Sequence, residues 1–526
     1  MRRILSYSEQ VPVVIVGSGP TGLTAGLLLA EYGVRSIILE KNAAPLGIPR
    51  AIVLDDEGLR TLQVFRADQA YLDLTVEGDG AQYIDDNGEV FGKVGAGPEN
   101  FGFPKRNFIN QPEFEKTLRD FVDASPLCTL HYNSNVTGIQ QFEDTVTVQV
   151  QDSAEVVHAI TANFVIAADG GRSPIREAAN ILMLGSTYEQ NWIVVDTLND
   201  PDQVRFSRFF CSNQRPHVSI PAPKGGRRYE FMLLPGETGD QALADGYVEN
   251  LLKPYRDIAP HDIVRKTLYT FHARIAENWR AGRVFLAGDA AHLTPPFAGQ
   301  GMNAGLRDAA NITWKIATVL NGVATDTILN SYQSERYDPA WSMILLAVAM
   351  GDVVMPIKPE QVAFREQLVK SMQPFPGVKD YFLNMKFKPK PRYDRGMFMG
   401  LDKPKYEASL VGEMIPQPKI ELDGQSGLLD EFLGSGFALI AQDKSGIEAM
   451  NCLKMNDYLG LPLAKLALPY KSGTGARSIS PWVKPLRTHR DEILLIRPDR
   501  YCAAAFEPAD LMDGLLSYEE LFSTPE

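Results

Sequence analysis

The sequence predicts an α/β fold class (α+β overall): a parallel sheet covered by helices, a second β-sheet domain inserted into it, and a smaller α/β unit at the C-terminus. Three observations predict it. A β-branched apolar run near residue 11 leads into a glycine-rich turn and a helical segment. Two later apolar runs, near residues 164 and 284, also end in glycine and an acid. The 526 residues, 44% of them hydrophobic, provide core for several domains.

The first element is a βαβ unit. Residues 11–16 predict a buried strand, Gly17-x-Gly19-x-x-Gly22 follows, and a helix leads to a second strand over 35–39 that ends on Glu40. In such a unit the glycines allow the tight turn, the approach of a pyrophosphate and close helix–strand packing, and the helix N-terminus offers free N–H groups. Because strand, glycines, helix and acid are in register, we expect a Rossmann-like dinucleotide site rather than a plain glycine-rich turn.

Two further strand ends belong to the same sheet. A run over 164–168 ends in Asp169-Gly170-Gly171, and a run over 283–287 ends in Gly288 and Asp289, before a helix that reaches residue 320. Carboxyl ends of parallel strands meet at one edge, where open α/β sheets bind ligands. Taken alone, Asp169 could simply cap a helix.

The remaining segments define the domain organisation. We expect helices over 51–65 and 111–122, and a β-meander with strands at 127–131, 136–140, 146–151 and 156–160 that returns to the buried strand at 164–168. Strand character at 191–196, 204–211, 218–221 and 229–234 predicts a second sheet. The predicted domains are a nucleotide-binding domain (1–75, 110–183 and 271–345), a β-sheet substrate domain (76–109 and 184–270), a helical cover and linker (346–404) and a C-terminal unit (405–526).

Composition excludes several classes of function. The formal charge of −13 and pI near 5.2 argue against a nucleic-acid surface, which needs clustered Lys and Arg. The four cysteines are widely spaced, with no CxxC and no metal-ligand pattern, so we expect reduced thiols, no metal and a cytoplasmic location. The sequence has no run of about 18 uninterrupted apolar residues, so we expect no membrane span.

Taken together, the three motifs resemble the FAD-dependent aromatic hydroxylases of the p-hydroxybenzoate hydroxylase type, the group A flavin monooxygenases. Among these the chain most resembles the phenol-ring hydroxylases that include 3-(3-hydroxyphenyl)propionate hydroxylase. The likeness covers nearly the whole chain. Besides the nucleotide motifs, the supporting stretches are 54–63, 191–196, 228–232 with 235–238, and 307–311.

The resemblance implies an FAD cofactor, NADH or NADPH and O2 as co-substrates, and hydroxylation of a phenol through a C4a-hydroperoxyflavin. Glu40 would hold the adenosine ribose, Arg50 and Gln111 would lie near the pyrophosphate and ribityl chain, and Asp289 would bind ribityl hydroxyls. The full set of implied cofactor-binding residues is Gly17, Gly19, Pro20, Thr21, Gly22, Glu40, Lys41, Arg50, Gln111, Asp169, Gly288, Asp289, Pro296, Gly299, Gly301, Met302 and Asn303.

The segment 299–303 would cover the isoalloxazine edge, with the amides of Gly301 and Met302 at a helix start whose positive end favours an anionic reduced flavin. Pro296, Gly301 and Met302 form the implied catalytic set. Polar and aromatic candidates for contact with the substrate are Arg106, Arg215, His217, Tyr229, Pro296 and Phe297. We expect His292 and His272 to be structural hydrogen-bonding groups rather than bases.

The C-terminal unit has a thioredoxin-like order of elements: strand 437–442, helix 447–459, strand 462–468, a hairpin around 497–500 and a last helix from residue 508. Asp443-Lys444-Ser445-Gly446 stands where a thioredoxin would carry CxxC. We therefore expect packing or dimerisation, in a homodimer, rather than redox chemistry.

Two alternatives remain open at this level. A flavoenzyme of the same fold could instead catalyse Baeyer–Villiger oxidation, dehydrogenation or halogenation, although the Trp-x-Trp-x-Ile-Pro stretch of flavin halogenases is absent. A non-catalytic nucleotide-binding protein with a C-terminal interaction module is the other.

Overall fold

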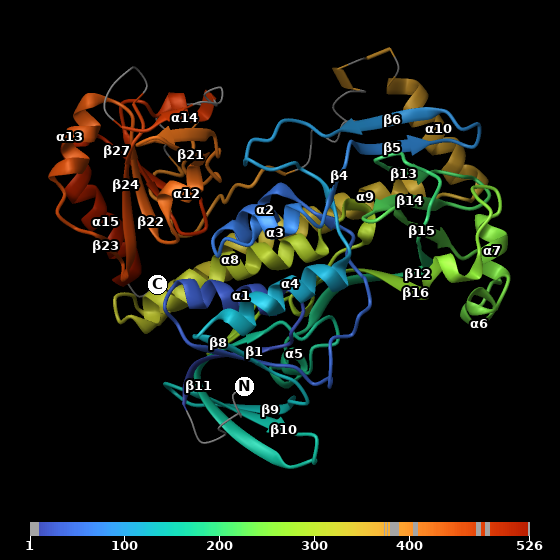
Figure 1. Cartoon of the computed structure of the whole chain (residues 1–526), viewed down its shortest axis with the longest axis horizontal. Helices are drawn as coiled ribbons and strands as arrows, with labels where there is room; N and C mark the ends of the chain where they lie inside the picture. Colours follow the sequence, from blue (N-terminus) through green and yellow to red (C-terminus); the bar gives the residue numbers. More distant parts are fainter. Residues whose placement is uncertain are drawn as a thin grey trace.

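The computed structural model describes residues 10–372, 374–375, 377–378, 389–402, 409–469, 475–478 and 484–523. A central domain carries the long helix α8, the C-terminal domain lies at one end of the molecule, and the second sheet lies at the other (Figure 1). The mixed α/β class is as the sequence predicts.

The first sheet is the predicted parallel one. Its order is β17-β18-β11-β1-β2-β8, with β10 and β9 added beside β11, and β1 pairs in parallel with both β2 and β11. The strands are β1 (Val11–Val16), β2 (Ser36–Leu39), β8 (Cys128–His131), β9 (Asn135–Gln141), β10 (Val146–Gln151), β11 (Val157–Ala167), β17 (Arg280–Ala281) and β18 (Val284–Leu286).

The two strands predicted at 156–160 and 164–168 form one continuous strand, β11. Its first half pairs with β10 in the meander, and its second half pairs with β1 and β18 in the parallel sheet. The prediction of a break was wrong because one strand serves both pairings, so the chain has no reason to turn between them.

Helices cover the parallel sheet, and α1 packs along α8. The predicted helix at 51–65 is shorter than expected, because residues 53–54 form a strand that pairs with Asn107 and Phe108, and Asp55 then caps the helix by accepting from the Gly58 N–H (2.8 Å). The elements are α1 (Pro20–Glu31), β3 (Val53–Leu54), α2 (Asp56–Gln63), α3 (Asp68–Leu72), β4 (Val76–Glu77), β7 (Asn107–Phe108), α4 (Gln111–Ala124), α5 (Pro174–Ala178), η2 (Gly288–Ala290), η3 (Pro296–Ala298), α8 (Gly301–Leu320), η4 (Asp326–Asn330) and α9 (Ser331–Val354).

The second sheet has the order β19-β16-β12-β15-β14-β13-β5-β6. Most of its members come from the two separate segments that the sequence assigns to the substrate domain, joined where β13 pairs with β5. The end of β16 and all of β19 lie beyond residue 270, in the segment predicted for the nucleotide-binding domain. The elements are β5 (Gly80–Ile84), β6 (Val90–Gly95), β12 (Met183–Thr197), β13 (Phe206–Phe210), β14 (His217–Ala222), β15 (Gly226–Met232), α6 (Gly239–Leu243), α7 (Tyr247–Leu252), η1 (Pro260–Asp262), β16 (Ile263–Ala276), β19 (His292–Leu293) and α10 (Pro359–Met372).

The C-terminal sheet has the order β23-β24-β22-β26-β27, with β22 parallel to β24 and antiparallel to β26. This is the thioredoxin-like arrangement that the sequence predicts. The elements are β20 (Lys419–Leu422), β21 (Gln425–Leu428), α12 (Leu429–Leu433), β22 (Phe437–Ala441), α13 (Lys444–Cys452), β23 (Asp457–Tyr458), β24 (Leu461–Ala467), β25 (Arg477–Ser478), α14 (Lys484–Thr488), β26 (Ile493–Ile496), β27 (Cys502–Phe506), η5 (Pro508–Asp510) and α15 (Leu511–Ser523). Helix α13 ends at Cys452, earlier than expected, because Leu453 returns to extended backbone.

Buried charges fasten this domain to the central one. Glu335 on α9 accepts from Lys315 on α8 (2.8 Å) and from Arg497 in the β26–β27 turn (2.7 Å), and all three side chains are fully buried. A second buried pair joins Arg60 to Asp430 (2.7 Å). Burial alone would raise the pKa of Glu335, but Arg497 and Lys315 together lower it to about 2. Because breaking such a cluster leaves a buried charge unpaired, the C-terminal domain is held firmly in place.

Among the described residues, one segment, 326–354, has the length and mean hydropathy of a membrane-crossing helix. It contains Pro339, and its buried Glu335 and Arg336 form ion pairs with α8 and the C-terminal domain. Its contacts are therefore those of a core helix. We propose the predicted division into domains because its boundaries fall close to those of the two eight-stranded sheets and of the five-stranded C-terminal sheet. The predicted cover and linker over 346–404 lies partly outside the described residues.

Candidate active site

A cavity of about 340 Å³ lies between the carboxyl edge of the parallel sheet and the second sheet. One wall comes from the turn before α1, the segment 48–53 and the start of α8, and the opposite wall comes from β12 to β16. The predicted site residues that line it are Gly19, Pro20, Thr21, Arg50, Arg106, Gln111, Asp289, Pro296, Phe297, Gly299, Gly301 and Met302.

The three glycines of the first turn differ in their surroundings. A Cβ on Gly17, whose φ is +101°, would lie 2.4 Å from the Ala168 carbonyl oxygen, and one on Gly22 would lie 2.1 Å from the Gly17 carbonyl oxygen. For Gly19, no described atom lies within 4 Å of that position, which opens into the cavity. Gly17 and Gly22 are thus required by the fold, whereas Gly19 leaves room for a ligand.

The start of α8 is the second place where backbone faces the cavity. A turn through Pro296 and Gly299 (φ +63°) leads into the helix at Gly301, and no described side chain caps the helix start or places an acid in its first turn. The free N–H groups and the positive end of the helix dipole therefore remain available for an anion. Position 301 has open space where a Cβ would stand.

The side chain of Asn303 is used within the protein. Its Nδ2 donates to the carbonyls of Val53 (3.1 Å) and Gly299 (2.9 Å), and its Oδ1 accepts from the Asp55 N–H (3.0 Å). All of these contacts are internal and the side chain is fully buried. Asn303 therefore positions the turn and the 53–55 segment, and only its backbone is left for a cofactor.

Glu40 and Lys41 lie outside the lining of the cavity, beyond the first turn. The Glu40 carboxylate accepts from the N–H (3.1 Å) and hydroxyl (2.9 Å) of Ser18 and from the Asn42 N–H (3.0 Å). It is held at the end of β2 next to the turn, as a ribose-binding acid must be. Its role in binding ribose stays a prediction.

Gln111 acts on the chain beside Arg50. Its Oε1 accepts from the backbone N–H groups of Arg50 (2.7 Å) and Ala51 (2.6 Å), and its Nε2 donates to Glu115 (2.7 Å). The side chain thus fixes the segment that carries Arg50 into the cavity wall.

The two strand-end acids are not equivalent. Asp289 lines the cavity. Asp169 is outside the lining and accepts from the Ile175 N–H (3.3 Å) in the first turn of α5, whose N-cap is Ser173. Burial raises its pKa. Its neighbours Ala168 and Gly170 do line the cavity, so the glycine turn rather than the acid reaches the site.

The two histidines considered as structural groups differ in position. His292 is fully buried, and its Nε2 lies 2.7 Å from Asp308, which also pairs with Arg336 (2.9 Å) and accepts from the Gly288 N–H (3.0 Å). His272 lines the cavity and is hydrogen-bonded to Thr187 (2.9 Å). Its pKa is lowered, by burial first and then by nearby arginines, which favours the neutral ring.

Three of the predicted substrate residues do not reach the cavity. Arg215 pairs with Glu237 (2.7 Å), His217 is hydrogen-bonded to the Tyr255 hydroxyl (2.6 Å), and Tyr229 donates to Asp200 (3.1 Å). Tyr229 points away because neighbouring residues on a strand face opposite sides of the sheet.

The opposite face of β15 brings Arg228 and Glu230 to the cavity, which the sequence analysis missed. Arg228 pairs with Asp196 (2.7 Å) and donates to the carbonyls of Pro49 (2.8 Å) and Arg50 (2.7 Å), so it clamps the loop at the cavity mouth. Burial raises the pKa of Glu230. The period-two pattern of 226–232 signals that residues 228 and 230 share a face, but not which face meets the ligand.

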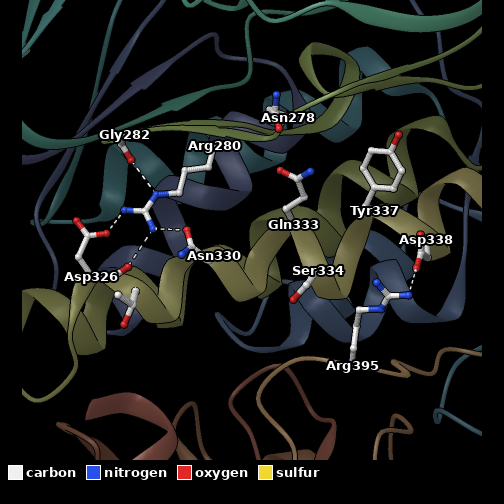
Figure 2. Close-up of a pocket in the computed structure, with 11 residues that line it drawn as sticks. Asn278, Arg280, Gly282, Asp326, Asn330, Gln333, Ser334, Tyr337, Asp338 and Arg395 are labelled. Atoms are coloured by element: carbon white, nitrogen blue, oxygen red, sulfur yellow. Dashed lines mark hydrogen bonds and ion pairs between the residues drawn. The ribbon is translucent and has the colours of Figure 1, made fainter. Parts of the chain in front are cut away.

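A second, wider groove of about 810 Å³ lies between the 278–282 segment and α9 (Figure 2). Its charges are paired with one another: Arg280 contacts Asp326 and donates to Asn330 (2.8 Å), and Arg395 contacts Asp338 (3.1 Å). Both arginines that line this groove are therefore paired with carboxylates of the groove itself, unlike the uncapped helix starts at the first cavity.

Comparison with known proteins shows the family of the chain. Residues 10–347 match the family described as FAD binding domain. The chain is 35% identical over 528 residues to a 3-(3-hydroxy-phenyl)propionate/3-hydroxycinnamic acid hydroxylase of Burkholderia cenocepacia (96% of this chain, 95% of the relative). It is 33% identical to the protein of that name from Escherichia coli K12 (96% and 94%).

Solved structures share the fold. The flavin-dependent monooxygenase PieE in complex with FAD and substrate superposes with a TM-score of 0.80 at 19% identity, covering 98% of this chain and 99% of that one. Aklavinone-11 hydroxylase with FAD and aklavinone gives 0.76 at 21% (97% and 98%). With its glycine turn, its uncapped α8 start and relatives along its whole length, the chain belongs to the family of FAD-binding aromatic hydroxylases and is an FAD-dependent monooxygenase.

Proposed function

We propose that this enzyme hydroxylates a phenolic ring that carries a short acidic side chain, of the 3-(3-hydroxyphenyl)propionate type named for its relatives. The observation that carries the proposal is the cavity itself, in which the turns expected to bind the cofactor face a wall of the second sheet that combines apolar side chains with arginines. A ring held there lies beside the cofactor and away from bulk water.

The residues present fit an FAD. Open space at Gly19 and Gly301, together with free N–H groups at the starts of α1 and α8, suits the pyrophosphate and the anionic edge of a reduced flavin. Arg50 and Asp289 would bind the pyrophosphate and ribityl chain, and Glu40 the ribose. When bound, FAD supplies the redox chemistry, accepting hydride from NADH or NADPH and delivering one atom of O2 to the ring.

The protein positions the substrate and keeps it dry. Val53, Phe209, Val218, Ile220 and Phe297 line the cavity, and Phe297 is held edge-on against Trp192 (5.8 Å between ring centroids) and Phe271 (5.4 Å). Excluding water strengthens the electrostatic contacts in the site and limits side reactions of the activated oxygen.

The test is a panel of phenols assayed with NADH or NADPH under labelled O2. We expect a substrate that raises the rate of NAD(P)H oxidation and yields a dihydroxylated product containing one labelled oxygen. Hydrogen peroxide should be the main product with aromatic acids that lack the phenol. Turnover with an artificial electron acceptor, without labelled oxygen in any product, would instead support the dehydrogenase alternative.

A further inference from the structure

Arg106 differs from the other arginines that line the cavity. Arg228 and Arg265 both contact Asp196 (2.7 and 3.3 Å), and Arg50 is exposed at the mouth. The Arg106 guanidinium makes one hydrogen bond, from Nη1 to the hydroxyl of Ser207 (3.1 Å), and no carboxylate of the described residues lies within ion-pairing distance.

The side chains around Ser207, the hydrogen-bond partner of Arg106, are mostly apolar. Ser207 is buried, and its neighbours in the cavity wall are the side chains of Phe209, Val218 and Ile220. Burial lowers the pKa of Arg106, and electrostatic interactions with Tyr83 and Asp55 oppose that shift. Arginine nevertheless stays protonated in proteins, so Arg106 brings to the cavity wall a positive charge that no carboxylate of the described residues pairs with directly.

The backbone holds this side chain in place. The Arg106 carbonyl accepts from the Gly78 N–H (2.8 Å), and the next residue, Asn107, donates from Nδ2 to the carbonyls of Leu54 (3.2 Å) and Pro104 (2.7 Å). A Cβ on Gly78 would lie 2.7 Å from the Phe108 ring and 3.2 Å from Arg106 Cγ, so the glycine makes room for both side chains. The Arg106 guanidinium therefore has a fixed position and no ion-pair partner among the described residues, which suits it to bind an anionic ligand.

We propose that Arg106, oriented by Ser207, binds the carboxylate of the aromatic substrate and thereby selects phenols with an anionic side chain. This inference rests on the proposed function and adds the group that recognises the acid. Because Ser207 occupies one N–H, the planar guanidinium keeps further N–H donors for a two-point contact with a carboxylate. The ring attached to that carboxylate then lies in the apolar part of the cavity, between Arg106 and the start of α8.

The experiment compares an acid with its neutral analogue in the FAD-loaded enzyme. The kcat/KM for 3-(3-hydroxyphenyl)propionate and for its methyl ester is measured in the wild type and in Arg106→Met, Arg106→Lys and Ser207→Ala. Arg205→Met is the matched control, because Arg205 is two residues from Ser207 but pairs with Asp79 (2.6 Å) at an exposed edge. Bound FAD per chain is measured for each protein.

We expect Arg106→Met to lower kcat/KM for the acid roughly 100-fold, because the buried charge pair is lost, and to change the value for the ester less than about threefold. Arg106→Lys should recover part of the acid preference, Ser207→Ala should lose part of it, and Arg205→Met should keep it.

Equal losses for acid and ester in Arg106→Met, or a loss of FAD, would overturn the inference and assign Arg106 a structural or cofactor role. A wild type that hydroxylates the ester as well as the acid would also overturn it while leaving the proposed function intact. A wild type that hydroxylates neither compound nor any other phenol would overturn the proposed function itself.

Discussion

Substitution with alanine can distinguish the glycines that the fold requires from those that leave room for the cofactor. In Gly22→Ala the new methyl group would lie 2.1 Å from the Gly17 carbonyl oxygen, so the backbone must move by more than an ångström. Overpacking of this kind costs about 1–3 kcal/mol, and more where backbone rather than side chain must shift. In Gly301→Ala the methyl group enters open space on the first turn of α8, where alanine favours the helix by up to about 1 kcal/mol.

We therefore expect opposite effects on the apoprotein and the holoenzyme. Gly22→Ala should lower the free energy of unfolding of the apoprotein. Gly301→Ala should leave that free energy unchanged or slightly higher, and should weaken FAD binding about 5-fold to 150-fold, the equivalent of losing 1–3 kcal/mol of close contact. Gly19→Ala should behave like Gly301→Ala, because its Cβ also meets open space.

Urea unfolding of the apoprotein and fluorescence titration with FAD measure the two quantities. If Gly301→Ala binds FAD and turns over as the wild type does, the start of α8 does not contact the cofactor. If Gly22→Ala unfolds at the wild-type urea concentration, the close approach at that turn does not constrain the fold. The distinction between glycines needed for folding and glycines needed for binding would then be wrong.

Three further predictions concern other parts of the chain. Glu40→Ala should weaken FAD binding about tenfold to a hundredfold through the loss of charge-assisted hydrogen bonds, and titration with unchanged affinity would remove Glu40 from the ribose site. Arg497→Met leaves Glu335 buried without its main cation and should lower the free energy of unfolding in urea by about 3–5 kcal/mol. Arg477→Met, which removes an exposed ion pair, should lower it by less than about 1 kcal/mol, and similar losses in the two variants would contradict the importance of the buried network. Burial lowers the pKa of His217 to about 4, so between pH 4 and about 6.5 the unfolded chain binds more protons than the folded one. The free energy of unfolding should therefore fall as the pH drops through this window. His217→Gln should flatten that part of the pH profile, and an unaltered slope would refute the prediction.

Local features of the sequence were sufficient for much of the fold. The β1–α1–β2 unit follows from apolar strand residues and the spacing of Gly17, Gly19 and Gly22, which act over a few residues. The thioredoxin-like order was also predictable, because its strands are separated by helices with their own caps, such as Asp443. Where two pairings share one strand, as in β11, local patterns failed because the partner strands are distant in sequence.

The candidate site shows the same division. The sequence by itself determined the two ligand-facing turns, because only glycine fits at Gly17 and Gly22 and because the α8 start follows a proline–glycine turn. Only the tertiary structure decided which polar residues face the cavity. Arg215 and Arg106 look alike in the sequence, yet Glu237 neutralises the first, whereas the second is left with Ser207. The physical reason is that a charged group pairs with the groups that the fold places within a few ångströms of it. Glu237 lies 22 residues from Arg215 in the sequence, and Ser207 lies 101 residues from Arg106.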